Sequence, residues 1–273
     1  MIDLEWLKGK RIVFVAIVIA SAWWAIATII ENQTISIAIL LAIIIALITH
    51  LLRQLWEELA FRSNEAQRIA EAWNSIYKLL PTLKTLPALS SFSLAPDAGL
   101  LILKQILQSK PATIVELGSG ISTMLISRLI EQEGLTTKLI SIESDNDCMI
   151  ECQQELIFQG TSKHVTFIYA PLTNNDVDGT NMLWYNSSVI PEGEIDMLII
   201  DGPPERKGTS ARYPAIPVLQ KQLSHQAIII ADDCGRKDVK DAVEKWMKLL
   251  KGAKSKTHRL VRPVTVIKLG DDS

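Results

Sequence analysis

Two long apolar segments stand near the start of the chain, and neither contains an Asp, Glu, Lys or Arg. The first covers residues 12–30 and the second covers residues 35–52. Each is long enough to cross the ~30 Å hydrocarbon core of a bilayer as a helix, and each is apolar on every face. Because only four residues separate them, they predict a hairpin of two transmembrane helices over residues 1–52.

The charges that flank the two segments predict the orientation of this hairpin. Three basic residues precede it within residues 8–11, and further Arg residues follow from Arg53 onward, whereas the turn carries only Glu31. Basic residues favour the cytoplasmic side, so both ends of the hairpin are predicted to lie in the cytoplasm. Two other interpretations stay open: a signal peptide for the first segment, or a buried helical hairpin of a soluble protein.

Residues 53–80 contain no Gly or Pro, and their apolar side chains recur at spacings of mostly three, four or seven. This period predicts an amphipathic helix that continues out of the membrane as a stalk. The stalk either pairs with a second copy of the chain, which would make a homo-oligomer, or packs against its own domain. Pro81 ends the helix and a Pro- and Ser-rich linker follows, so the predicted stalk and linker cover residues 53–93.

From residue 94 onward, short apolar runs alternate with segments of helical period. The runs that predict parallel strands cover residues 112–117, 138–143, 164–169, 195–201 and 227–232. Such alternation is typical of a doubly wound sheet. Residues 259–261 and 264–268 flank Arg262-Pro263 and predict a final antiparallel pair. Residues 94–273 therefore predict an α/β domain, with a Rossmann-like, doubly wound, mostly parallel seven-stranded sheet that ends in an antiparallel hairpin.

Composition and charge narrow the classes of partner. The formal net charge is −2, so no basic field favours binding to nucleic acid. The three cysteines, Cys148, Cys152 and Cys234, lack the spacing of a metal site, and we interpret them as reduced cytosolic thiols. The hydrophobic content of 48% is high for a soluble enzyme, and its excess lies in the N-terminal segments.

A glycine turn follows the first predicted strand of the domain. Gly118 and Gly120 allow a ligand to approach the backbone closely, beside the N-terminus of a helix. Glu143 ends the second strand, 23 residues after Gly120, where a carboxylate can accept both hydroxyl groups of a ribose. The NAD fingerprint needs a third glycine where this chain has Thr123. Glu116, just before the turn, suits the amino acid part of S-adenosylmethionine better than a dinucleotide.

Several motifs together carry a resemblance to a known family. They are Glu116-Leu117-Gly118-Ser119-Gly120, Ser141-Ile142-Glu143, Ala170-Pro171-Leu172, Trp184-Tyr185, Asp201-Gly202-Pro203-Pro204, Arg212-Tyr213-Pro214 and Asp232-Asp233. Residues 94–269, which contain these motifs, resemble a class I S-adenosylmethionine-dependent methyltransferase and look most like its bacterial family 24 branch. The resemblance does not extend to the N-terminal apolar segments.

The resemblance implies a set of cofactor-binding residues, namely Glu116, Gly118, Ser119, Gly120, Glu143, Ala170, Pro171, Leu172 and Asp201. In this set the glycine turn lines the methionine end, Glu143 holds the ribose, and residues 170–172 flank the adenine. Two positions depart from the family pattern. Ser122 stands where a third glycine is common, and residues 170–172 contain no Asp to contact the adenine.

Carboxylates follow two of the apolar strands where each strand ends: Asp201 after the fourth, and Asp232 and Asp233 after the fifth. Ligands of open α/β sheets bind beyond these strand ends. In placement the three acids resemble the divalent-cation site of catechol-type O-methyltransferases, and hard oxygens suit Mg²⁺, which would orient an acceptor hydroxyl. Without a cation, Asp201 or Asp232 would act as a general base. A third interpretation makes the acids caps of neighbouring turns and helices.

The residues predicted to contact the methyl acceptor are Arg212, Tyr213, Trp184, Tyr185 and Lys207. Basic side chains in the loop after the fourth strand suit an anionic group, and the aromatic pair suits a stacking wall. The features together predict a membrane-anchored, S-adenosylmethionine-dependent methyltransferase that methylates a hydroxyl oxygen of a small or lipid-linked acceptor. An NAD(P)-type oxidoreductase and a non-catalytic, membrane-tethered scaffold of the same fold stay open as alternatives.

Overall fold

The structure is a computed structural model that describes residues 17–18, 21–26, 28, 33–85, 94–204 and 210–270. The chain divides into two compact units, Met1–Asn64 and Glu65–Ser273, and each is described by itself. The first predicted transmembrane helix lies mostly outside the described residues, and its described positions are helical. The proposed two-helix hairpin therefore stays a prediction.

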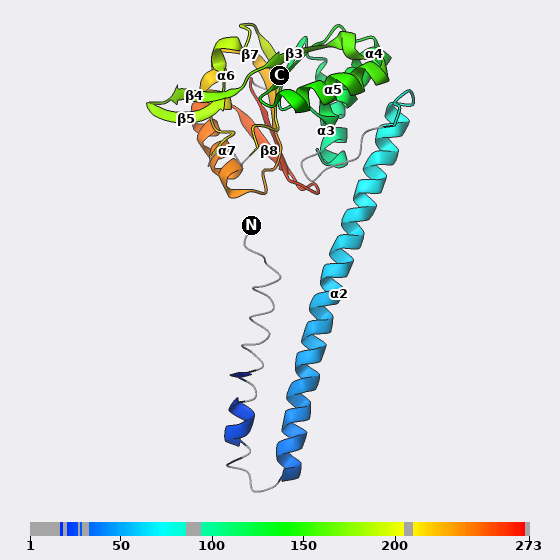
Figure 1. The fold of residues 1–273 in the computed structure, drawn as a ribbon, viewed down its shortest axis with the longest axis vertical. Helices are drawn as coiled ribbons and strands as arrows, with labels where there is room; N and C mark the ends of the chain where they lie inside the picture. Colours follow the sequence, from blue (N-terminus) through cyan, green and yellow to red (C-terminus); the bar gives the residue numbers. More distant parts are fainter. Residues whose placement is uncertain are drawn as a thin grey trace. The chain divides into compact units, whose positions relative to one another are not determined.

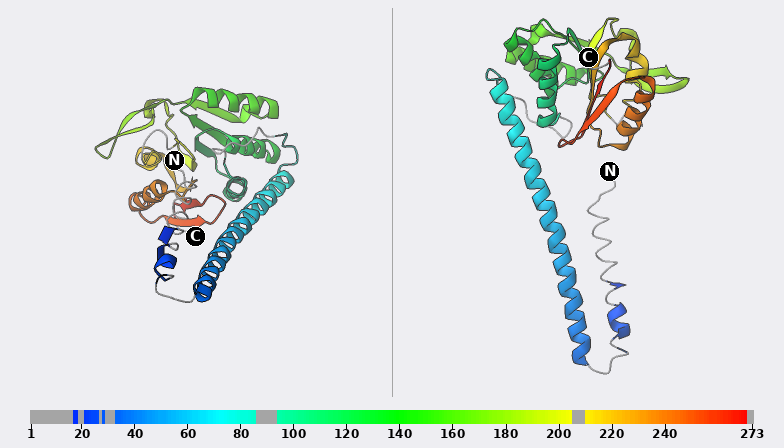
Figure 2. Two further views of the ribbon diagram at one scale, coloured as in Figure 1. Left: turned by 60° about the horizontal axis from the view of Figure 1, so that its bottom comes forward. Right: turned by 180° about the vertical axis from the view of Figure 1, so that it is seen from behind.

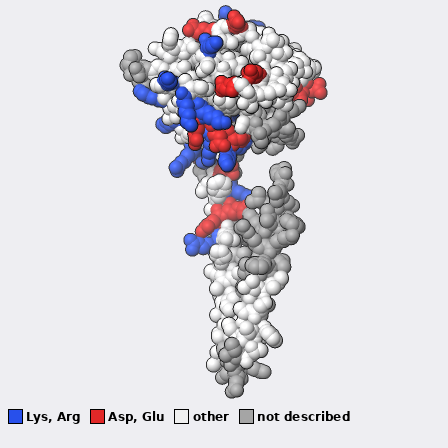
Figure 3. Space-filling view, turned by 90° about the vertical axis from the view of Figure 1, so that its left-hand side faces the viewer, with Lys and Arg blue, Asp and Glu red and all other residues white. Residues whose placement is uncertain are grey.

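Helix α2 (Gln33–Leu79) is one unbroken helix of 47 residues, shared by the two units (Figure 1). It joins the second predicted transmembrane segment to the predicted stalk, because no Gly or Pro interrupts residues 33–79. Among the described residues, α2 is the one helix long and apolar enough to cross a membrane, by length and composition alone. Most of its apolar side chains in the first unit are exposed, and Figure 3 shows few charged groups there.

The last turns of α2 belong to the second unit. Ala72 and Ile76 of α2 are buried, as is Leu80, which follows the helix, and Trp73 packs against the cluster that contains Ile76 and Leu80. Arg68 donates a hydrogen bond to the carbonyl oxygen of Arg259 (2.6 Å). This half of the predicted stalk therefore packs against its own domain, which is one of the two alternatives that the sequence left open.

The domain is built on a seven-stranded sheet in the order β3-β2-β1-β6-β7-β9-β8. The parallel strands are β1 (Thr113–Leu117), β2 (Lys138–Glu143), β3 (Val165–Tyr169), β6 (Ile195–Ile200) and β7 (Leu223–Ala231). Strands β8 (Lys254–His258) and β9 (Val264–Lys268) form an antiparallel hairpin beside β7. The predicted mostly parallel sheet with a terminal hairpin is confirmed.

Helices cover both faces of this sheet (Figures 1 and 2). One face carries α3 (Pro96–Ser109), α4 (Ile121–Glu133) and α5 (Asn146–Gln159). The other carries α6 (Ala215–Leu219) and α7 (Lys237–Leu249). Because the chain moves outward from β1 to β3 and then returns to β6 on the other side of β1, the order of strands reverses between β1 and β6. Ligands of doubly wound sheets bind at such a reversal, beyond the carboxyl ends of the strands.

The structure adds a two-stranded hairpin that the sequence analysis did not predict. Strands β4 (Leu172–Val177) and β5 (Thr180–Tyr185) pair antiparallel outside the main sheet. The turn between them is Asp178-Gly179, and both residues have positive φ, 51° and 76°. An Asp-Gly pair with this backbone is the favoured two-residue hairpin turn, because its twist matches that of the strands. The hairpin begins where the residues expected to flank the adenine end.

Two predicted elements differ from the observed ones. The helix expected over residues 210–223 is limited to the short α6 and a 3₁₀ turn (Gln220–Gln222). Pro214 and Pro217 explain the late start of the helix, since proline is tolerated only in the first turn. The penultimate strand lies at β8 rather than at residues 259–261. Its sequence is polar throughout, as edge strands often are, so apolar periodicity does not reveal it.

Candidate active site

The glycine turn lies against the loop that follows β6. Gly118 has φ 98°, a conformation that favours glycine. A Cβ added there would come 3.4 Å from the backbone nitrogen of Gly202 and 3.5 Å from the carbonyl carbon of Asp201. The backbone nitrogen of Asp201 donates to the Leu117 carbonyl oxygen (3.0 Å). The predicted cofactor side and the first of the three acids therefore share one rim of the sheet.

Open space surrounds the second glycine of the turn. A Cβ built on Gly120 meets no heavy atom within 4 Å, and Gly120 is the residue before the N-terminus of α4. Its backbone nitrogen donates to Thr123 Oγ1 (2.9 Å). Thr123 stands where the NAD fingerprint needs a glycine. In the structure its side chain caps the N-terminus of α4. The space beside Gly120 leaves room for a ligand at the positive end of the helix dipole.

Glu116 is a fully buried carboxyl group on β1. Its Oε2 accepts hydrogen bonds from Thr123 Oγ1 (2.5 Å) and Ser141 Oγ (3.2 Å), while its Oε1 has no partner among the described residues. Burial raises the pKa of Glu116 to about 7, although hydrogen bonds from neighbouring hydroxyl groups oppose the shift. A buried carboxyl oxygen without a donor is a place for a cationic or hydrogen-donating group of a ligand.

Glu143 is held in one orientation by backbone N–H groups. Its Oε2 accepts from the nitrogen of Ser119 (2.9 Å), and its Oε1 accepts from the nitrogens of Ser144 (2.6 Å) and Asp145 (2.8 Å). Each carboxylate oxygen has two acceptor positions, so Oε2 keeps one for a ligand hydroxyl. The geometry therefore places a fixed carboxylate at the end of β2, where the sequence predicts the ribose contact.

The segment expected to flank the adenine lies directly beside Glu143. The backbone nitrogen of Ala170 donates to the Glu143 carbonyl oxygen (2.7 Å), and Ala170 is fully buried. The Pro171 carbonyl oxygen accepts from the nitrogen of Asn186 (3.0 Å), and Leu172 begins β4. These three residues therefore border the same end of the sheet as Glu143.

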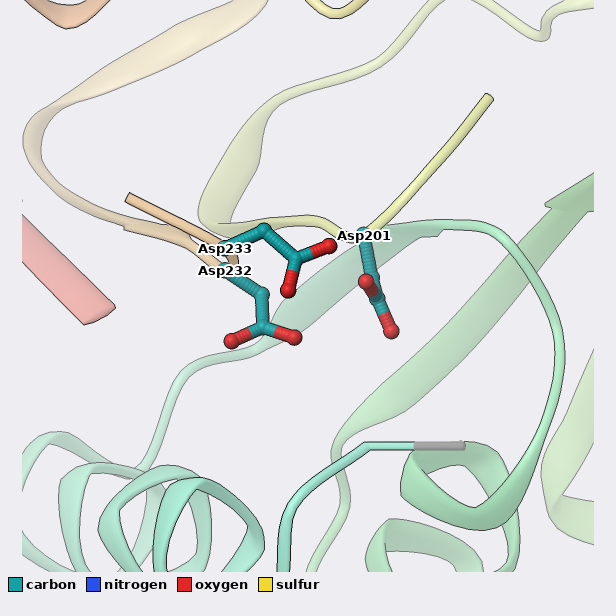
Figure 4. Close-up of side chains that lie close together, drawn as sticks. All are labelled: Asp201, Asp232 and Asp233. Carbon is teal, nitrogen blue, oxygen red and sulfur yellow. The ribbon is translucent and has the colours of Figure 1, made fainter. Parts of the chain in front are cut away.

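The three acids of the sequence prediction meet at the ends of β6 and β7. We call this group, Asp201, Asp232 and Asp233, the acid rim (Figure 4). One carboxylate oxygen from each lies within 4.8 Å of one oxygen from each of the others. The sequence predicts that two neighbouring strands bring these acids together. The structure agrees, because β6 and β7 pair in parallel.

Arg212 lies among these carboxylates and is almost fully buried, with 4% of its surface exposed. Its Nη2 donates to Asp201 Oδ1 (3.1 Å), to the Asp201 carbonyl oxygen (2.9 Å) and to Asp233 Oδ2 (3.0 Å). Its Nη1 donates to the Asp232 carbonyl oxygen (2.7 Å). The sequence predicted that Arg212 contacts the acceptor, whereas these bonds direct its guanidinium to the acid rim.

The acid rim holds its carboxyl groups at raised pKa values. Burial raises the pKa of Asp201 well above its usual range, the charge of Asp232 adds to the effect, and Arg212 opposes it. Burial also raises the pKa of Asp232, with the charge of Asp233 as the next cause. Both carboxylate oxygens of Asp232 lack a hydrogen-bond donor among the described residues. Asp232 is therefore the acid of the rim that is left to bind an incoming group.

The structure buries both residues of the predicted aromatic wall, and their contact with an acceptor stays a prediction. Trp184 and Tyr185 are both fully buried, and their rings pack edge to face at 5.3 Å. A Cβ added to Gly202 would collide with the Tyr185 hydroxyl group. The Tyr185 phenol therefore lies beside the loop that follows β6. Burial raises the pKa of Tyr185 well above its usual range, and the charge of Glu143 adds to the shift. Tyr185 therefore stays a neutral donor at the site.

Tyr213 holds the hairpin β4–β5 against the domain. Its hydroxyl group donates to Asp178 Oδ2 (2.7 Å), and this bond raises the pKa of Tyr213. Lys245 Nζ lies 4.9 Å from the centre of the Tyr213 ring, and Trp246 Nε1 donates to the Tyr213 carbonyl oxygen (2.8 Å). The predicted acceptor contact by Tyr213 stays a prediction, and Lys207 lies outside the described residues.

Ser141 also belongs to the site, although it is absent from the residues predicted to bind the cofactor. Ser141 donates to Glu116, and its hydroxyl group also lies 2.8 Å from that of Ser119. A signal was present: Ser141 and Glu143 stand two residues apart in an otherwise apolar strand, so both point to the same face of the sheet.

Comparison with known families matches residues 115–234 to Methyltransf_24, described as a methyltransferase domain. Residues 115–234 are therefore similar to a methyltransferase domain. This stretch contains the glycine turn, Glu143 and the acid rim, so the matched region includes the site as a whole. No curated protein matches the full sequence significantly.

Solved structures share the fold of the methyltransferase domain at low sequence identity. An O-methyltransferase from Bacillus cereus in complex with SAH is 12% identical with a TM-score of 0.51, covering 75% of this chain and 91% of that chain. The SAH-bound Podospora anserina methyltransferase PaMTH1 is 17% identical with a TM-score of 0.50, covering 79% and 97%. A methyltransferase from Geobacter sulfurreducens is 12% identical with a TM-score of 0.51, covering 66% and 81%.

Proposed function

We propose that the chain is a membrane-anchored methyltransferase that transfers a methyl group from S-adenosylmethionine to a hydroxyl oxygen of a small or lipid-linked acceptor. One observation carries the enzymatic half of this proposal: the glycine turn at Gly118 lies against the Asp201–Gly202 loop. The donor side of the site therefore adjoins the acid rim, and a methyl group held at the turn would face a nucleophile held by the acids. Methyl transfer in line needs this short separation.

The donor side fits S-adenosylmethionine on the chemistry of its residues. The unpartnered Oε1 of Glu116 suits the α-ammonium group, and the open space at Gly120 suits a carboxylate at a helix N-terminus. The free acceptor position of Glu143 suits a ribose hydroxyl. When bound, this cofactor supplies a methyl group on a positively charged sulfur.

The acceptor side supplies a proton acceptor. As the oxygen–methyl bond forms and the sulfur–methyl bond breaks, the acceptor hydroxyl must lose its proton. Asp232 is buried, its carboxylate has no donor among the described residues, and its pKa is raised. A carboxylate with a raised pKa is a better base near neutral pH. We therefore propose that Asp232 accepts this proton, while Arg212 holds Asp201 in place.

The acid rim was also a candidate metal site. The three acids bring hard oxygen ligands together, but Arg212 already binds two of these carboxylates from within the rim. This arrangement fits a buried cation of the protein better than Mg²⁺. No step of the proposed reaction uses a metal ion.

The proposed membrane anchor rests on the first unit. Helix α2 presents a long apolar surface with no buried residue in its most apolar window. The basic residues that flank the two apolar segments support a two-pass topology with the methyltransferase domain in the cytoplasm. A lipid bilayer is therefore the proposed partner of residues 1–52.

Cofactor binding tests the enzymatic half of the proposal. Calorimetry on the full chain in nanodiscs should show micromolar binding of S-adenosylhomocysteine and no binding of NADH. Glu143→Ala should weaken that binding at least tenfold, whereas Glu151→Ala, an exposed acid on α5, should leave it unchanged. Binding of neither ligand would favour the scaffold, and binding of NADH alone would favour an oxidoreductase.

Membrane retention and thiol labelling test the other half. Membranes washed with sodium carbonate should retain the full chain and release a chain that begins at Glu65. Cys148 is exposed while Cys152 and Cys234 are buried. A membrane-impermeant maleimide should therefore label Cys148 only after the cells are opened. Labelling of Cys148 in sealed cells would contradict the cytoplasmic orientation.

A further inference from the structure

We infer that Arg212 is the resident cation of the acid rim, and that the rim works without a divalent metal ion. The inference rests on the proposed function, and it assigns to Arg212 the role that a bound metal ion would have between the three carboxylates. It concerns ion binding, which is measured separately from cofactor binding and turnover.

The hydrogen bonds of Arg212 join the ends of two neighbouring strands. Arg212 lies in the loop before α6. It donates to Asp201, which follows β6, and to Asp232 and Asp233, which follow β7. The guanidinium donates to four oxygen atoms: two belong to carboxylates and two to backbone carbonyl groups. Charge-assisted bonds of this kind are short and directional, and a planar guanidinium binds several oxygens at once. Arg212 therefore fixes the geometry of the rim as a coordinated ion would.

A metal ion bound by these three acids would lie close to the guanidinium of Arg212. Mg²⁺ binds oxygen ligands at about 2.1 Å in near-octahedral geometry. Asp201 Oδ1 and Asp233 Oδ2 both already accept from one nitrogen of Arg212. An ion that used these oxygens would stand beside a fixed positive charge that is buried with it. Repulsion between the two cations therefore disfavours metal binding while Arg212 is in place.

Guanidinium groups of the protein offset much of the negative charge of the rim. Besides Arg212, Arg262 Nη1 lies 3.7 Å from Asp233 Oδ1, and Arg236 Nη1 lies 3.8 Å from Asp233 Oδ2. Arg236 also binds Asp238, whose Oδ2 lies 2.8 Å from Arg236 Nη2, so its charge is shared between Asp233 and Asp238. The buried guanidinium of Arg212, with Arg262 beside Asp233, offsets much of the negative charge that would otherwise attract a divalent ion.

Arg212 binds the three acids in different ways. It binds the side chains of Asp201 and Asp233, but it binds Asp232 only through the backbone carbonyl oxygen. The Asp232 carboxylate is thereby positioned and left without a donor among the described residues. Arg212 acts as a positioning residue, and Asp232 is the group that meets the acceptor.

Manganese binding tests this inference. Mn²⁺ titrated into the metal-stripped full chain in nanodiscs and followed by electron paramagnetic resonance should show no bound ion at millimolar concentration. Arg212→Gln exposes the carboxylates and should bind Mn²⁺ at least tenfold more tightly than the wild type, and Asp232→Asn in that background should reverse the gain. Arg236→Gln, which leaves every bond of Arg212 in place, is the matched control and should bind no Mn²⁺.

Stoichiometric Mn²⁺ binding by the wild type, abolished by Asp232→Asn, would overturn the inference. If Arg212→Gln does not fold, the wild-type titration still decides, and Arg212→Lys gives a second comparison. Lysine keeps the charge but not the fork of donors, so this variant should also bind no Mn²⁺. S-adenosylhomocysteine binding is measured on the same samples, so loss of the proposed cofactor and gain of a metal are told apart.

Discussion

The backbone of Gly118 lies against the backbone of Gly202, so closely that a side chain at position 118 would come 3.4 Å from the Gly202 nitrogen. This contact joins the loop after β1 to the loop after β6, on the two sides of the point where the order of strands reverses. The arrangement of the donor and acceptor sides depends on it, and it makes Gly118 a sensitive position.

We expect Gly118→Ala to weaken both the fold and the site. Its φ of 98° strains an L-residue, and the methyl group would press on Gly202. The free energy of unfolding should fall by about 1–2 kcal/mol, and affinity for S-adenosylhomocysteine should fall at least tenfold. Gly193→Ala, where no atom lies within 4 Å of the added Cβ, is the control. Equal effects of the two substitutions in denaturation and calorimetry would contradict the role of the contact.

Glu116 should make the stability of the ligand-free protein depend on pH. Its pKa rises from 4.5 to about 7 on folding, so the folded state binds the proton more tightly than the unfolded state. This contribution is complete below pH 4.5 and is lost as pH rises through 7, and it amounts to about 3 kcal/mol. Denaturant titrations of Glu116→Gln should lack this part of the decline between pH 5 and 8. Glu133→Gln, an exposed residue, should keep it.

The same carboxyl group should make cofactor binding depend on pH in the opposite sense. A ligand ammonium group pairs with Glu116 only when the carboxyl is ionised, so affinity for S-adenosylhomocysteine should rise about tenfold from pH 6 to pH 8. In Glu116→Gln the affinity should be weaker and flat with pH. Calorimetry across this range checks both statements, and an unchanged slope in the variant would place the ammonium group elsewhere.

Asp232→Asn should remove turnover while leaving the donor side intact. Loss of a positioned base costs roughly 10²–10⁴-fold in rate. Binding of S-adenosylhomocysteine should stay within twofold of the wild type, since Asp232 does not belong to the donor side. Asp241→Asn, on the exposed face of α7, is the matched control for the loss of one charge. A variant that keeps its kcat would show that another group takes the proton.

The buried end of α2 should contribute to the stability of the methyltransferase domain. Ile76 is fully buried in the core cluster that includes α3 and α4. Ile76→Ala leaves a cavity and should lower the free energy of unfolding by about 2–5 kcal/mol. Asn74→Ala, at an exposed position of the same helix, should change it by less than about 0.5 kcal/mol. Similar stability of the two variants would mean that the stalk helix does not belong to the folded domain.

The parts of the fold that the sequence predicts well are those with strong apolar patterns. The inner parallel strands β1, β2, β6 and β7 are largely buried, so each reads as an apolar run, and the polar residue that ends a run marks the edge of the sheet. For this reason Glu143, Asp201 and Asp232 were placed at one edge from the sequence alone. The glycine turn was recognisable because Gly118 and Gly120 stand between a strand and a helix.

Elements with weak apolar patterns were missed or misplaced. Strand β8 is an exposed edge strand, and the pairing that defines it comes from β9 rather than from its own side chains. The hairpin β4–β5 is signalled by Asp178-Gly179, a local turn signal that apolar periodicity does not measure. The position of Arg212 depends on contacts between residues 11 to 21 positions apart, which no local pattern contains.

The carboxylate of Glu143 is fixed by three backbone N–H groups before any ligand arrives. Under the proposed function, a carboxylate fixed in this way keeps its orientation when the donor binds. The same contacts are open to the demethylated product, since the two differ only in the transferred methyl group. We therefore expect strong product inhibition. The rate of methylation in the cell would then follow the ratio of donor to product rather than the concentration of the donor alone.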